Sequence, residues 1–173
     1  DKDLVIKLLS SISAPPGRFN IIKSDANIIG VVDYAHTPDA LKKVILSISN
    51  FCKITQELIV VVGCGGDRDR GKRAIMGKIA FENSRMAIFT SDNPRSENPE
   101  SIINDMCSNL SENSKNKIQK ISNREDAISF AVNNALQGSI VLVVGKGHEK
   151  FQETNGEKIP FDDYQILKKL LKS

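Results

Sequence analysis

The 173-residue sequence contains no tryptophan, only two histidines and three cysteines, and aromatic residues make up 5% of it. Two histidines are too few for a histidine-rich metal site. Cys52, Cys64 and Cys107 have neither metal-ligand nor disulfide-framework spacing, which indicates free thiols in a reducing, cytoplasmic compartment. No apolar run approaches the roughly 20 residues of a membrane-spanning helix, so no membrane contact is expected.

The sequence also lacks an excess of either charge. Its formal net charge is +3, from 24 Lys and Arg against 21 Asp and Glu. No dense basic face is interleaved with aromatic residues, which argues against nucleic acid as a partner. With 40% hydrophobic and 26% charged residues, the composition is that of a globular protein able to bury one sizeable core.

Short apolar runs alternate with stretches of helical apolar spacing. This alternation predicts an α/β, Rossmann-like fold, with a mostly parallel sheet covered by helices on both faces and room for one antiparallel strand or a small hairpin. The strands are expected at 18–24, 27–34, 58–63, 86–89, 117–121 and 140–144, with 27–34 central; the helices at 38–51, 71–83, 99–110, 124–136 (closed by Gly138) and 162–171 (capped by Asp162); and a hairpin with Asn155-Gly156 at its tip at 151–159.

The first residues predict a separate unit. Apolar spacing over 4–12 is helical, and Ala14-Pro15-Pro16-Gly17 breaks the helix before the first strand. We therefore expect residues 1–16 to be the tail of a preceding domain with an interdomain linker, and residues 17–173 to form one domain.

Polar or glycine-rich loops follow four of the predicted strands, after Val32, Val62, Phe89 and Val144. In a parallel sheet these loops converge on one edge, where open α/β sheets bind their ligands. The loop at 92–95, Asp-Asn-Pro-Arg, offers an acid, an amide, a rigid turn and a guanidinium, a set able to hold both charged ends of an amino acid.

The segment Gly66–Lys72 matches G-x-x-x-x-G-K, yet it does not read as a phosphate-binding P-loop. Arg73 stands where a Mg²⁺-binding Ser or Thr is needed, and two acids within the segment would repel phosphate. A tight turn that presents Arg68 and a helix N-terminus to an anion is the better interpretation. A structural glycine turn with solvated charges stays open as the alternative.

Two more strand ends carry candidate contacts. Gly145 permits close backbone approach of a ligand, and Glu149 could pair with an ammonium group, although exposed loop charges would explain the same residues. Asp33 suits ribose hydroxyls and His36 a phosphate or base, or else Asp33 caps a turn and His36 is solvated. Arg18 offers a cation before the first strand, or is a surface residue. The sequence has no G-x-S-x-G motif, so a serine hydrolase is not expected.

Five segments in this order resemble the C-terminal domain of the Mur ligases of peptidoglycan synthesis, and most of all the members that add the third residue of the stem peptide. The segments are Gly-Arg-Phe-Asn at 17–20, Val-Asp-Tyr-Ala-His-Thr-Pro-Asp at 32–39, Gly-Cys-Gly-Gly-Asp-Arg-Asp-Arg-Gly-Lys-Arg at 63–73, Asp-Asn-Pro-Arg at 92–95 and Gly-Lys-Gly-His-Glu at 145–149.

The resemblance implies an ATP-dependent ligase that joins an amino acid to UDP-N-acetylmuramoyl-L-alanyl-D-glutamate through an acyl phosphate. It implies an upstream ATPase domain of the same chain, which would hold the P-loop and the Mg²⁺ ligands. This fragment would then contain no catalytic residue and no metal ligand, and alone it would be inactive. The alternative is a stand-alone nucleotide- or anion-binding module without ligase activity.

The resemblance also implies roles for individual residues. The Asp-Asn-Pro-Arg motif is the form associated with meso-diaminopimelate rather than lysine, and a guanidinium suits the carboxylate by which the two differ. Asn20 departs from the acidic residue common at its position. The implied contacts are Arg68, Asp92, Asn93, Pro94, Arg95, Gly145 and Glu149 for diaminopimelate, and Arg18, Asp33 and His36 for ATP.

Overall fold

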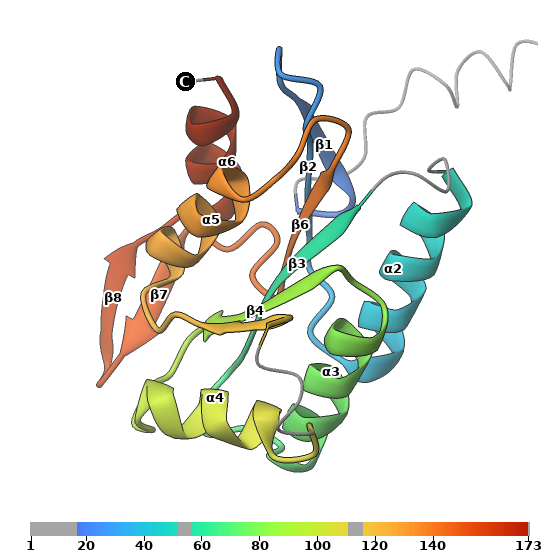
Figure 1. Cartoon of the computed structure of the whole chain (residues 1–173). Helices are drawn as coiled ribbons and strands as arrows, with labels where there is room; N and C mark the ends of the chain where they lie inside the picture. Colours follow the sequence, from blue (N-terminus) through green and yellow to red (C-terminus); the bar gives the residue numbers. More distant parts are fainter. Residues whose placement is uncertain (1–16, 52–56, 111–115, 173) are drawn as a thin grey trace, which may run out of the picture.

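A computed structural model describes residues 17–51, 57–110 and 116–172 (Figure 1). The helix predicted at 4–12 and the linker at 1–16 lie outside these residues. The described strands are β1 (Asn20–Lys23), β2 (Ile29–Asp33), β3 (Leu58–Cys64), β4 (Met86–Ser91), β5 (Ile118–Lys120), β6 (Ile140–Val144), β7 (Phe151–Thr154) and β8 (Glu157–Pro160); the helices are α2 (Pro38–Phe51), α3 (Gly71–Glu82), α4 (Pro99–Cys107), α5 (Arg124–Asn133) and α6 (Asp163–Lys172).

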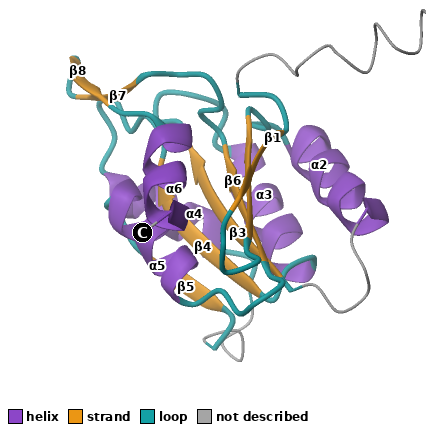
Figure 2. Ribbon diagram, turned by 90° about the horizontal axis from the view of Figure 1, so that it is seen from above, coloured by secondary structure: helices purple, strands orange, loops and turns teal. Residues whose placement is uncertain are grey.

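Six of the strands form one sheet in the order β1-β2-β6-β3-β4-β5. Only β1 runs antiparallel in it, beside β2, and the other four pairings are parallel. The predicted fold class is confirmed, with its antiparallel strand and also its hairpin, β7–β8, which stands apart from the sheet (Figure 2). The strand predicted to be central, now β2, lies inside the sheet but next to its β1 edge, and β6 and β3 occupy the centre.

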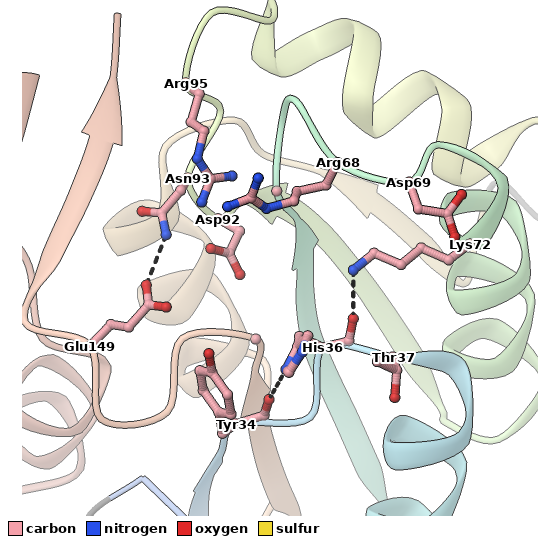
Figure 3. A pocket seen from close by; sticks show the side chains of 12 residues that line it. Tyr34, His36, Thr37, Arg68, Asp69, Lys72, Asp92, Asn93, Arg95 and Glu149 are labelled. Carbon is pink, nitrogen blue, oxygen red and sulfur yellow. Dashed lines mark hydrogen bonds between the residues drawn. The ribbon is translucent and has the colours of Figure 1, made fainter. Parts of the chain in front are cut away.

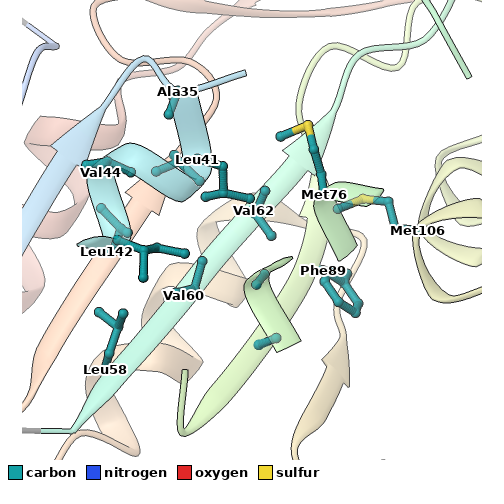
Figure 4. Packing of buried hydrophobic residues seen from close by; sticks show 14 of the residues in the cluster. Ala35, Leu41, Val44, Leu58, Val60, Val62, Met76, Phe89, Met106 and Leu142 are labelled. Carbon is teal, nitrogen blue, oxygen red and sulfur yellow. The ribbon is translucent and has the colours of Figure 1, made fainter. Parts of the chain in front are cut away.

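Alternate residues of the central strands supply two cores. Val60 and Val62 of β3 face α2, α3 and α4, where they pack with Leu41 and Met76 (Figure 4). Ile59 and Val61 point the other way, toward α5 and α6. Because successive strand residues alternate between faces, a run apolar at every position is what a sheet covered on both sides requires.

Asparagine and aspartate side chains cap the N-termini of α4, α5 and α6. Asn98 and Asn123 accept hydrogen bonds from backbone amides in the first turns of α4 and α5. Asp162 Oδ1 accepts from Tyr164 N and Gln165 N, as predicted. The predicted end of the helix at 124–136 is wrong, because α5 ends at Asn133. Gly138, with φ of 84°, belongs instead to the following turn, where its amide donates to Asn27 O.

Candidate functional site

A cavity of about 500 Å³ lies at the carboxyl ends of β2, β3, β4 and β6 (Figure 3). The convergence of four loops on one sheet edge is therefore confirmed. The predicted site residues that line the cavity are His36, Arg68, Asp92, Asn93, Arg95, Gly145 and Glu149; Arg18, Asp33 and Pro94 do not line it.

The Arg95 backbone is fixed by the β7–β8 hairpin. Arg95 N donates to Glu153 O at 3.0 Å, and Asn155 N donates to Arg95 O at 2.7 Å. Arg95 has φ of 52°, a left-handed conformation that a non-glycine residue holds at some cost unless its surroundings enforce it. Its guanidinium donates to Gly66 O at 2.7 Å and has Nε 3.5 Å from Glu153 Oε2. The side chain is thus aimed into the cavity before any ligand arrives.

Asn93 is the centre of a buried polar network. Its Nδ2 donates to Glu149 Oε2 at 2.8 Å, and its Oδ1 accepts from Lys146 Nζ at 2.8 Å and from Glu153 N at 3.0 Å. Lys146 is fully buried and lies 3.3 Å from Glu149 Oε2. The alternative of exposed loop charges is therefore wrong for Lys146. No local pattern in the sequence indicated its burial, because its acceptor Asn93 is distant in the chain.

Asp92 is a buried acid that faces this network. Burial raises the pKa of its carboxyl group, and the charges of Arg124 and Lys146 oppose the rise. Its Oδ1 is 3.9 Å from Lys146 Nζ. A Cβ atom at Gly145, where φ is 115°, would lie 2.5 Å from Asp92 Oδ2, so these two strand ends approach each other as only glycine allows. Pro94 lies in the same loop; it is buried, and its carbonyl accepts from Glu97 N.

The loop after β3 is joined closely to the Arg95 loop. A Cβ atom at Gly66 would lie 1.9 Å from Pro94 O, and Gly66 N donates to Asn93 O at 2.9 Å. Arg73, at the position where a P-loop has Ser or Thr, is fully buried and donates to Glu97 and Asp105 at 2.7–2.9 Å. Hydrogen bonds from Arg73 and from the Asp67 amide lower the pKa of Glu97 to about 2.

The residues that line the β2 end of the cavity are exposed or half-buried: His36 and Thr37 are exposed, and Tyr34 is half-buried. Asp33 accepts from Phe19 N and Ala35 N, both at 2.8 Å, so its carboxylate caps the turn in this structure. His36 is exposed, and its ring centroid is 4.7 Å from that of Tyr34. Lys72 Nζ donates to His36 O at 2.8 Å. Tyr34 and Lys72 also line the cavity, and neither was predicted as a site residue, although Tyr34 lies within the motif at 32–39.

Within residues 17–51, 57–110 and 116–172, no cluster of three or more His, Cys, Asp or Glu side chains is placed to hold a metal ion. The helices of the same ranges include none with the length and apolar character needed to cross a membrane.

Known proteins are similar to this chain in sequence and in fold. Residues 17–147 match the family model described as Mur ligase, glutamate ligase domain. UDP-N-acetylmuramoyl-L-alanyl-D-glutamate--2,6-diaminopimelate ligases are 46% identical over 99% of the chain in Cytophaga hutchinsonii and 48% identical over 91% in Listeria monocytogenes. A solved structure of a ligase with that name superimposes with a TM-score of 0.83 at 40% identity, over 99% of this chain.

The chain spans about a third of the length of these relatives: 35% and 31% of the two sequences and 34% of the solved chain. The match to the family model, over residues 17–147, covers most of the chain. The chain belongs to the family of Mur ligase C-terminal domains.

Proposed function

We propose that this chain is the C-terminal domain of an ATP-dependent ligase that adds meso-diaminopimelate to UDP-N-acetylmuramoyl-L-alanyl-D-glutamate, and that the cavity binds the diaminopimelate. The observation that carries the proposal is the charge pattern of the cavity. The Arg68 and Arg95 guanidinium groups point into it from two loops, with Asp92 and Glu149 beside them (Figure 3).

Both signs of charge are what the distal end of diaminopimelate needs. Its carboxylate can take paired hydrogen bonds from a guanidinium, and its ammonium group can lie against Asp92 and Glu149. Asn93 and Gly145 complete the pocket, with Pro94 as the rigid turn that sets the loop. Lysine lacks the second carboxylate, so it would leave the guanidinium donors unpaired in a partly buried site.

The β2 end of the cavity is the proposed ATP side. His36 lines the cavity at this end; Arg18 and Asp33, which do not line it, are the other candidate contacts, with Asp33 on the ribose. ATP would supply the phosphoryl group that activates the substrate carboxylate, and an upstream domain of the same chain would hold the phosphates and Mg²⁺. This domain would hold the amine that attacks. In this proposal residues 1–16 link the two domains, residues 17–173 form the C-terminal one, and the enzyme is cytoplasmic.

The test uses the full-length protein that contains this chain. We expect tripeptide formation with meso-diaminopimelate, and a kcat/KM for lysine lower by about 10⁴-fold, because the site is built to pair a group that lysine lacks. Equal use of lysine would contradict the pocket assignment. The 173-residue chain alone should not hydrolyse ATP; turnover by the purified fragment would favour the stand-alone module instead.

A further inference from the structure

Arg124 is the first residue of α5, and its guanidinium is completely buried. Nε donates to Asp163 Oδ1 at 2.8 Å, and Nη2 donates to Asp163 Oδ2 at 2.7 Å. Asp163 is the first residue of α6 and is buried as completely. The pair therefore joins the N-terminal ends of the two helices that cover the same face of the sheet (Figure 1).

The remaining donors of Arg124 reach the sheet. Nη1 donates to Ser91 O at 3.2 Å, and Nη2 donates to Val144 O at 2.9 Å. Ser91 and Val144 are the last residues of β4 and β6. These strands are not neighbours, because β3 lies between them. One guanidinium thus holds the ends of two separated strands at a set spacing.

The residues that follow these two carbonyls belong to the candidate site. Asp92 comes directly after Ser91, and Gly145 comes directly after Val144. The two loops are close enough that a Cβ atom at Gly145 would lie 2.5 Å from Asp92 Oδ2. A small change in the spacing of the strand ends would therefore move the Asp92–Arg95 loop relative to Gly145 and Glu149.

We propose that Arg124, oriented by Asp163, is a positioning residue that sets the spacing between the two loops of the amino-acid pocket. The inference rests on the proposed function, and it assigns Arg124 no contact with substrate. Its planar fork suits the role, since four hydrogen bonds in two directions need several donors in fixed geometry. A buried charge is costly to hold, and an arginine that only filled the core could be replaced by an apolar side chain.

The decisive variants separate positioning from stability. Arg124→Lys keeps the charge and the pairing with Asp163, but a single ammonium group cannot reproduce the fork. The double variant Arg124→Met with Asp163→Leu removes both charges, so that neither is left buried without a partner. Arg85→Lys is the matched control. Arg85 pairs with Glu57 and donates to Asn134 O at the opposite end of the sheet, away from the cavity.

Steady-state kinetics of the full-length enzyme would be measured with each substrate varied, alongside thermal unfolding. In both Arg124 variants we expect the KM for diaminopimelate to rise by about 10- to 100-fold, the range that a displacement of about 1 Å in a site produces. The KM values for ATP and the muramoyl substrate should stay close to wild type, and Arg85→Lys should change none of the three.

Two results would overturn the inference: a diaminopimelate KM in either folded variant equal to that of Arg85→Lys, or an equal rise in all three KM values with lowered thermal stability. Either folded variant is sufficient for the decision. Failure of the proposed function has a different signature, because the wild-type enzyme would then form no diaminopimelate adduct at all.

Discussion

Arg68 and Arg95 face the same cavity, but the loops that carry them are built differently. Arg95 is held by two backbone hydrogen bonds from the β7–β8 hairpin and donates to Gly66 O. The Arg68 side chain is exposed, and its Nη1 donates to the carbonyl of its own neighbour, Asp67, at 3.3 Å. One guanidinium is positioned in advance by contacts from distant parts of the chain, whereas the other is attached only locally.

The difference suggests a division of labour in the proposed pocket. A preorganised donor loses little freedom when a carboxylate binds, so its interaction contributes most of its strength to affinity. An exposed arginine loses side-chain entropy on binding and is screened by solvent, so it contributes less. The two arginines should therefore respond unequally to the same substitution.

Arg95→Ala should have the largest effect. We expect kcat/KM for diaminopimelate to fall by the equivalent of about 2–5 kcal/mol of transition-state stabilisation, as when one member of a partly buried charge pair is removed. The KM for ATP should change much less. Arg68→Ala should cost only about 1 kcal/mol, as exposed pairs do. Steady-state kinetics of the full-length enzyme would check both, and equal losses would remove the distinction between the loops.

Arg73→Met tests the connection between the loops. The buried Arg73 guanidinium holds Glu97, whose Oε1 also accepts from the Asp67 amide. We expect its removal to lower the free energy of unfolding by about 3 kcal/mol, because Glu97 loses its main counter-ion. Urea unfolding of the chain would measure this.

Arg70→Met is the matched control for Arg73. Arg70 approaches the same two acids at 3.5 Å, but its side chain is 67% exposed. Its loss should cost about 0–1 kcal/mol, as exposed pairs do. A similar cost for both variants would show that burial is not what makes the Arg73 contacts stabilising.

The parts of the fold that were predictable are those set by local patterns. Apolar runs predicted β3 and β6, and the polar loops after four strands predicted the edge of the sheet at which the cavity lies. The buried charges were not predictable, because a lysine or arginine is buried only where distant acceptors meet it. Lys146 needs Asn93, which is 53 residues away, and Arg124 needs Asp163, 39 residues away. The turn-capping by Asp33 was foreseen as an alternative, but nothing in the pattern could choose between it and a ribose contact.

Asp92→Asn should raise the free energy of unfolding at neutral pH. Burial raises the Asp92 pKa above its unfolded value, so any stability from this group is present at low pH and is lost as pH rises through the folded pKa. At neutral pH the Asn variant should therefore be more stable than wild type, by about 1 kcal/mol, and the gain should shrink toward pH 4. Urea unfolding at pH 4 and pH 7 would show this. A variant less stable at pH 7 would mean that the pairing with Lys146 outweighs the burial.

Glu153→Gln is the mildest test of how Arg95 is held. Glu153 pairs with Arg95 at 3.5 Å, but both side chains are partly exposed, and such pairs contribute about 0.2–1 kcal/mol. The bonds of Arg95 to Gly66 O and to the hairpin backbone do not involve the Glu153 carboxylate and should persist. Removing that negative charge should therefore strengthen the attraction of Arg95 for a substrate carboxylate, and lower the KM for diaminopimelate by about 1.4- to fivefold, the equivalent of that range. A raised KM would instead show that the ion pair, and not the backbone of the hairpin, aims the guanidinium into the cavity.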